Sequence, residues 1–129
     1  MRYDMGIAQR QPQADPAVVL TKATLRATDM LHLSGGELAQ VLGVSPSTVT
    51  RYRANTAVIA PGSKPGQLAL LLIRVFRSLD PLVGSGDGER KAWMQSRHKV
   101  LGGVPAQLVL TPDGLVKTLD YLDGMRAAA

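Results

Sequence analysis

The sequence predicts an all-α protein in which a helix-turn-helix unit is followed by a second helical unit. Two observations lead to this prediction. Apolar residues recur at spacings of three and four in the long segments, and capping residues and prolines stand where these segments begin. No segment shows a convincing strand pattern. We expect a mobile arm over residues 1–14, a helix-turn-helix domain over residues 15–60 and a second helical domain over residues 66–129.

The first helix is predicted over residues 17–32, after a polar, Gln-rich start that shows no periodicity. Asp15 and Pro16 form the helix start signal. The apolar side chains of this segment fall on or near one face, so we expect the helix to pack across the pair that follows. That face is expected to hold Val19, Leu20, Ala23, Ala27, Met30 and Leu31.

Residues 33–53 have the pattern of two short helices joined by a glycine turn. Ser34 can cap the first helix, and Glu37 stands three positions later, where a capping box requires it. Gly43 ends that helix in the left-handed conformation that glycine adopts most easily. Ser45 caps the second helix and Pro46 fills its first turn, where no amide hydrogen bond is lost. This is the helix-turn-helix pattern, in which the second helix enters the DNA major groove.

The second helix of this pair has an inward and an outward face. Val49 and Tyr52 are three positions apart and can pack inward. Residues 38–79 contain five basic residues and no acidic one, an imbalance that would attract a polyanion. The alternative is an αα-hairpin that packs without touching DNA. The outward side chains are the candidates for contact with operator DNA: Ser47, Thr48, Thr50, Arg51 and Arg53.

Residues 57–66 are predicted to form a loop or hinge, because prolines and glycines cluster there. The helix expected next, over residues 67–82, is the most apolar segment and needs partners on a wide arc. It is the centre of the core, a dimer seam or both, since small chains often complete a core across a two-fold axis. Arg74, Arg77 and Ser78 are expected to lie away from the apolar residues. The candidate dimerisation residues are Leu68, Leu72, Val75 and Phe76.

Residues 84–88 are rich in glycine, but they lack the following Lys-Ser/Thr and the preceding strand of a phosphate loop. We therefore interpret them as a connector between helices. Trp93 is more consistent with a core anchor than with an exposed binding residue. Further helices are predicted over residues 88–97, 105–110 and 115–125, the last with a stripe of Leu115, Leu119 and Leu122.

Composition excludes several classes of site. The chain has no cysteine and only two histidines, so neither thiolate chemistry nor a histidine metal cluster is expected. Asp120 and Asp123 share a solvated helix face, and Ser96 and His98 lack a third group to orient the histidine. We expect no catalytic residue, no metal, no cofactor and no small-molecule substrate. With no signal peptide and no membrane span in the sequence, we expect a cytoplasmic protein that has no membrane partner.

Four short runs in the second half carry a family resemblance: Ala92-Trp93-Met94, Leu101-Gly102-Gly103-Val104-Pro105, Leu110-Thr111-Pro112-Asp113-Gly114-Leu115 and Tyr121-Leu122-Asp123-Gly124-Met125-Arg126. Together they resemble the toxin-binding domain of Xre/MbcA/ParS-type antitoxins. The helix-turn-helix at residues 33–53 and the segment at residues 74–80 are also similar to that family. The resemblance covers nearly everything after residue 16, and it is specific in the second half and generic in the first.

The resemblance implies the antitoxin of a bacterial two-component module. Its partner would be a RES-domain toxin, similar to ADP-ribosyltransferases, that depletes cellular NAD. Members of the family are all-helical, dimerise, cover the toxin active site with their C-terminal region and often repress their own operon. We therefore expect a homodimer that binds operator DNA, with the plug for the toxin in residues 117–129. The candidate toxin-binding residues are Asp120, Tyr121, Asp123, Met125 and Arg126.

Two questions stay open at this point. An acidic side chain of the plug could pair with a cationic group that holds the NAD phosphates, or Arg126 could meet an acidic residue of the toxin. The chain could also be a stand-alone helix-turn-helix transcriptional regulator, whose second half only dimerises or senses a small molecule. A toxin-like protein encoded by the adjacent reading frame would favour the antitoxin.

Overall fold

The computed structural model describes residues 14–128, and that part of the chain contains helices and turns but no strand. The predicted arm at residues 1–14 lies outside the described residues except for Ala14. The all-α prediction is confirmed for the described part. Its helices are α2 (Pro16–Met30), α3 (Gly35–Leu42), α4 (Pro46–Arg53), α5 (Lys64–Leu82), α6 (Asp87–Gln95), α7 (Pro105–Leu108) and α8 (Pro112–Ala128).

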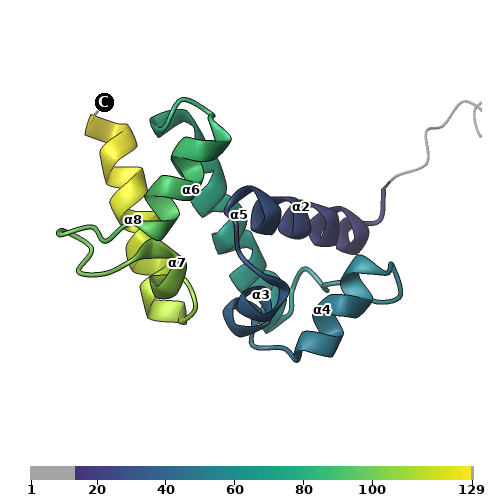
Figure 1. Ribbon diagram of the computed structural model, residues 1–129. Helices are drawn as coiled ribbons and strands as arrows, with labels where there is room; N and C mark the ends of the chain where they lie inside the picture. The colour runs from purple at the N-terminus through teal and green to yellow at the C-terminus, as the bar shows by residue number, and fades with distance from the viewer. Residues whose placement is uncertain (1–13, 129) are drawn as a thin grey trace, which may run out of the picture.

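The long helix α5 connects the two halves of the molecule (Figure 1). It packs against α2 and α3 of the first half and against α8 of the second half. The short helix α4 packs on α3, whereas α7 packs on α6 and α8. Buried residues from both halves form one continuous hydrophobic cluster. The sequence-predicted division at residues 60–66 therefore does not separate two cores.

Helix α2 begins as predicted and ends earlier. The Asp15 carboxylate accepts a hydrogen bond from the Ala17 amide, and the helix stops at Met30 because His32 adopts a φ of 59°. Val19 does not belong to the buried face, since it is 51% exposed. The inner face is instead completed by threonines whose hydroxyls donate to backbone carbonyls four residues earlier: Thr21, Thr24 and Thr28.

The helix-turn-helix pair forms as its caps predict. The Ser34 hydroxyl accepts from the Glu37 amide at 3.0 Å, and the Glu37 carboxylate accepts from the Ser34 amide at 2.8 Å. Gly43 ends α3 with a φ of 70°, and the Ser45 hydroxyl caps α4 by accepting from Thr48.

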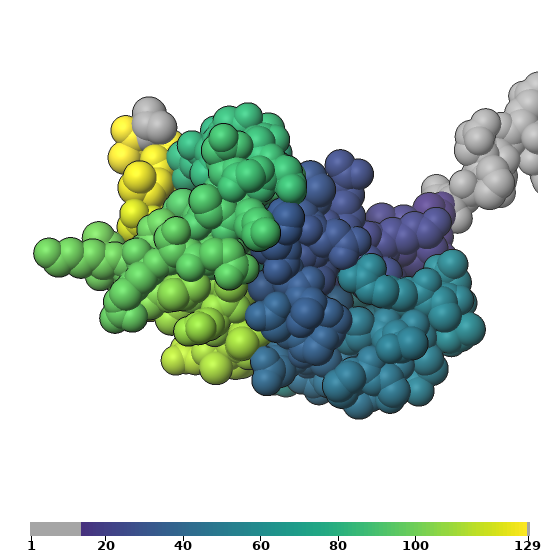
Figure 2. Space-filling model, viewed as in Figure 1, coloured from purple at the N-terminus to yellow at the C-terminus, as the bar shows by residue number. Residues whose placement is uncertain are grey.

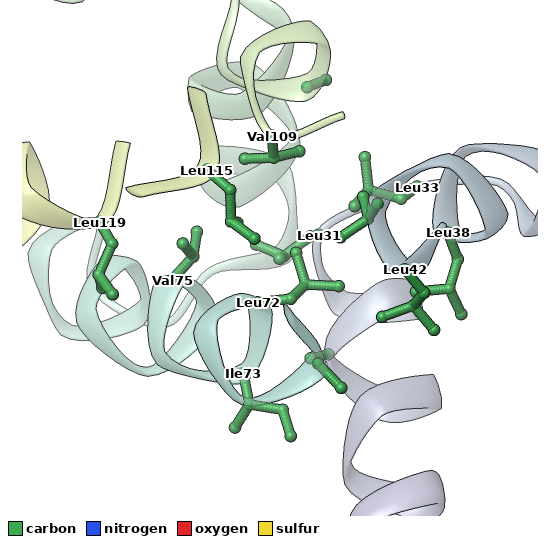
Figure 3. Packing of buried hydrophobic residues seen from close by; sticks show 14 of the residues in the cluster. Leu31, Leu33, Leu38, Leu42, Leu72, Ile73, Val75, Val109, Leu115 and Leu119 are labelled. Carbon is green, nitrogen blue, oxygen red and sulfur yellow. The ribbon is translucent and has the colours of Figure 1, made fainter. Parts of the chain in front are cut away.

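Helix α5 starts inside the predicted loop. The Ser63 hydroxyl accepts from the Gly66 amide and Pro65 fills the first turn, so the helix begins at Lys64 rather than at residue 67. Leu72 and Val75 are fully buried, and Figure 3 shows Leu72 among side chains from the first and second halves. Ser78 is also buried, against the prediction that it lies away from the apolar residues.

The C-terminal helices differ from prediction mainly in their ends. Helices α6 and α7 end two residues early, whereas α8 runs from Pro112 to Ala128 and so includes most of the predicted plug. Its buried stripe contains Leu115, Leu119 and Leu122, as predicted, and also Thr118. Trp93 is half-buried against the core, and the fully buried anchor of α6 is Met94.

Candidate functional site

Helix α4 presents most of its predicted DNA-contacting side chains to solvent. Ser47, Thr50, Arg51 and Arg53 are exposed, and Thr48 is half-buried. The opposite face holds Val49 and Tyr52, which are buried against α3 and its neighbours. A short polar helix anchored by two side chains and exposed along its other face has the form of a recognition helix.

The two arginines of α4 have different partners. The Arg53 guanidinium pairs with Asp29 of α2, with Nη2 2.8 Å from Oδ1. The Arg51 guanidinium donates to the Thr48 hydroxyl at 3.1 Å and has no carboxylate partner among the described residues. Arg51 therefore has the more available charge, and Arg53 partly serves to hold α4 against α2.

Burial also shifts the pKa of Tyr52, one of the two anchors of α4. Removal from water raises the pKa of the Tyr52 phenol, and the nearby Arg51 charge opposes this only in part. A phenol with the ordinary pKa of about 10 is already neutral at physiological pH, and the upward shift strengthens this preference. This keeps the inner face of α4 uncharged while its outer face carries positive charge.

The outward face of α8 holds the predicted toxin-binding residues in different environments. Asp120 and Arg126 are exposed and Met125 is 46% exposed. Tyr121 and Asp123 are half-buried, because they lie next to the stripe that packs on α5. The C-terminal region is thus a helix that packs on α5 with one face, so that only its solvent-exposed face is available to a partner.

A polar network joins α8 to α5. The buried Ser78 hydroxyl donates to the Asp123 carboxylate at 2.8 Å and accepts from Arg126 Nη1 at 3.2 Å. Arg74 Nη2 lies 3.4 Å from Asp123 Oδ2. Asp123 is therefore occupied within the chain and is a poorer candidate for a cationic group of the toxin than the sequence indicated.

This network lines a hollow of about 550 Å³ that is open to solvent between α5 and α8. We call it the arginine hollow; its lining residues are Arg74, Arg77, Ser78, Asp123, Arg126 and Ala127. Three guanidinium groups face one carboxylate there, so the hollow carries net positive charge. The sequence prediction included Asp123 and Arg126 but not the α5 side chains, because their approach to α8 depends on tertiary packing.

The predicted dimerisation face needs correction. Leu72 and Val75 are 0% exposed, so they pack inside the chain and offer no surface to a second copy. Leu68 and Phe76 are half-buried and retain some surface. The apolar periodicity of α5 is explained by its place between α2, α3 and α8, without a dimer seam.

An ionic junction that the sequence did not reveal ties the two halves together. Arg90 of α6 is 3% exposed and pairs with Asp80 at 2.8 Å and with Asp87 at 3.0 Å. Its Nε also donates to the carbonyl of Met30 at the end of α2. Asp87 in turn contacts His32 at 2.9 Å. The sequence did not predict this junction because its groups come from separate segments of the chain. Each residue taken alone has the character of an ordinary surface charge.

The remaining polar candidates do not converge. Ser96 donates to the Ala92 carbonyl and His98 Nε2 contacts the Trp93 carbonyl, so the two side chains serve the local turn separately. The Thr111 hydroxyl and backbone amides at the start of α8 lower the pKa of Asp113. Within residues 14–128 no three His, Asp or Glu side chains are placed to hold a metal ion. No helix in the same range is long and apolar enough to cross a membrane.

Comparison with known proteins gives two family matches along the chain, and the boundary between them falls within α5. Residues 10–74 match the family model of the antitoxin Xre-like helix-turn-helix domain. Residues 78–127 match the family model of the antitoxin Xre/MbcA/ParS C-terminal toxin-binding domain. The first match ends within α5, so that helix is shared between the two. The search of curated proteins finds no match to the chain.

Proposed function

The chain belongs to the Xre/MbcA/ParS-type antitoxins, and on that premise we propose that it neutralises a RES-domain toxin and represses its own operon. The tandem match of a helix-turn-helix domain and a toxin-binding domain carries this proposal. Both partners, toxin and DNA, follow from the two domain types. The identity of the toxin as a RES-domain protein that degrades NAD rests on the family resemblance.

Toxin inhibition is steric in this proposal. A blocker of an NAD pocket needs a surface that covers the pocket and no catalytic group of its own. The outward face of α8 supplies such a surface with Asp120, Tyr121 and Met125, while the opposite side of the helix is fixed to the core. Arg126 lies at the edge of this surface, next to α5. A toxin that depletes cellular NAD acts in the cytoplasm, so the antitoxin acts there as well.

Repression is assigned to α4. In a homodimer, two copies of α4 would meet half-sites about one helical turn of DNA apart. Ser47, Thr50 and Arg51 are exposed on its outer face, and Arg51 is the cation with no internal carboxylate partner. The dimer contact lies outside the buried part of α5, because Leu72 and Val75 are fully buried within the chain.

Co-expression of the chain with a RES-domain toxin from the same operon tests the first half of the proposal. We expect growth to be restored by the wild-type chain and not by Met125→Glu, which places a charge on the exposed face of α8. Deleting residues 121–129 is a poor test, because it removes the fully buried Leu122 and unfolds part of the core. Failure of the wild-type chain to rescue growth would reject the antitoxin function.

Operator binding is tested separately with Arg51→Ala. Loss of one phosphate or guanine contact per half-site is expected to weaken binding about tenfold or more in a mobility-shift titration at fixed salt. Arg53→Ala should weaken it less, because Arg53 is partly neutralised by Asp29. Arg97→Ala, on the exposed surface of the second half, is the control. An unchanged affinity in Arg51→Ala would remove α4 from the DNA contact.

A further inference from the structure

We infer that the arginine hollow between α5 and α8 receives an acidic side chain of the toxin. The inference rests on the proposed toxin-binding function and specifies the chemistry of one contact. It also extends the toxin-binding surface beyond the matched toxin-binding domain. Arg74 is the last residue of the helix-turn-helix match, Arg77 lies between the two matches, and Arg126 belongs to the second.

The charge balance of the hollow identifies its ligand as an anion. Asp123 is the one carboxylate in the lining, and it already contacts Arg74 and the Ser78 hydroxyl. Within the described residues, Arg77 and Arg126 have no carboxylate partner. Two guanidinium groups are therefore left to be paired, and their planar donor geometry suits a carboxylate.

The hollow is also partly organised before any partner arrives. The buried Ser78 hydroxyl holds Arg126 at 3.2 Å and Asp123 at 2.8 Å, so one hydroxyl fixes two charged side chains of α8. Asp123 in turn orients Arg74 at 3.4 Å. Side chains that are already ordered lose less conformational entropy on binding, which favours a contact at this position.

A toxin side chain fits better than the other possible occupants. A second copy of the chain placed symmetrically over the hollow would bring six arginines together against two aspartates, which is repulsive. DNA is disfavoured by position, since the end of α8 lies on the opposite side of the molecule from α4 (Figure 1). The surface that is predicted to meet the toxin continues directly into the hollow through Arg126.

The test is a double charge reversal, Arg77→Glu with Arg126→Glu, in the full-length chain. Both side chains are exposed, so the fold should be retained, and a far-UV spectrum and a urea titration verify this. Affinity for the RES-domain toxin of the same operon should fall at least about 30-fold, as expected when an interfacial charge pair becomes repulsive. The control is Lys91→Glu with Lys99→Glu, which makes the same change in net charge at two exposed positions outside the hollow.

Two further measurements separate the possible outcomes. Inorganic phosphate should perturb the side-chain NMR signals of the hollow arginines in the wild type, with a Kd on the order of millimolar, and not in the double variant. If phosphate leaves these signals of the wild type unchanged, the anion site is overturned. This result can be obtained even if the wild-type chain fails to bind the toxin. Unchanged toxin affinity in the double variant would overturn the toxin contact. Reduced operator affinity instead would assign the hollow to DNA and likewise overturn it.

Discussion

The exposed face of α4 and the seam between α5 and α8 hold their functional side chains in different ways. On α4 the outward residues contact one another or the surface of α2, and Val49 and Tyr52 are the side chains that bury the inner face of the helix. On α8 the outward residues grade into a buried stripe, and Asp123 and Arg126 share one buried hydroxyl of α5. The exposed face of α4 contributes little to the packing of the fold, whereas the seam between α5 and α8 contributes directly to that packing.

This difference has a consequence for mutations. Substitutions on the outer face of α4 should change DNA binding with little effect on the free energy of unfolding. Substitutions along the α5–α8 seam should change both toxin binding and stability, because the same side chains serve both. The projecting turn between α6 and α7, visible in Figure 2, belongs to neither surface and gives positions such as Lys99 for controls.

The largest effect is expected from Gly114→Ala in the first turn of α8. A Cβ there would lie 2.0 Å from the Leu108 carbonyl oxygen, a backbone atom that cannot turn aside. We expect the free energy of unfolding to fall by about 3 kcal/mol as α7 and α8 are forced apart. Urea denaturation followed by circular dichroism measures this.

Gly124→Ala in the same helix is the matched control for that prediction. Apart from its chain neighbours and the adjacent turns of its own helix backbone, nothing lies within 4 Å of its Cβ position, so the substitution should stabilise the chain by about 0.5–1 kcal/mol through helix propensity. Equal effects of the two substitutions would contradict the tight packing between α7 and α8.

A smaller effect is expected from Ser78→Ala, and it compares the two surfaces directly. Loss of the hydroxyl breaks the hydrogen bonds to Asp123 and Arg126, which should cost about 1 kcal/mol because both charged groups can still reach water. Ser47→Ala removes a hydroxyl on the exposed side of α4 whose one side-chain partner within residues 14–128 is Ser45, and it should change stability by less than about 0.5 kcal/mol. Similar losses in both variants would mean that the two surfaces are equally coupled to the fold.

The sequence predicted well those features that depend on near neighbours. The capping box of Ser34 and Glu37 and the left-handed Gly43 involve contacts within a few residues, and both are found in the structure. The inward position of Tyr52 was predicted from its local spacing to Val49, and it is also found. The same locality explains the missed start of α5. Pro61 and Gly62 indicate a loop, but the helix begins directly after them because Ser63 provides the cap.

Features that depend on distant neighbours were not predictable in this way. The buried Thr21 donates to a carbonyl of its own helix and accepts from the Ile59 amide, 38 positions away. Arg90 likewise obtains its partners from the ends of α2 and α5. Periodicity assigns threonine and arginine to the surface, and only the tertiary fold supplies the hydrogen bonds that allow their burial.

The smallest effect concerns the junction between the two halves and is lost in acid. A hydrogen bond from His32, with a further contribution from Arg90, lowers the pKa of the Asp87 carboxyl below its usual value of about 3.9. Because the unfolded chain binds this proton more readily, the stabilising effect is present above that pH and is lost as the pH falls through the lower, folded-state pKa.

The stability difference between the wild type and Asp87→Asn should therefore shrink as the pH is lowered from about 5 to about 3, measured as urea midpoints. The control is Glu89→Gln, on the exposed side of the same helix. Its stability difference from the wild type should not shrink in this way between these pH values, because Glu89 has no ion pair among the described residues. Parallel curves for the wild type and Asp87→Asn would mean that the contact with His32 does not stabilise the junction in solution. In that case the two halves would be held together by their shared apolar core and by the hydrogen bonds and ion pairs of Arg90.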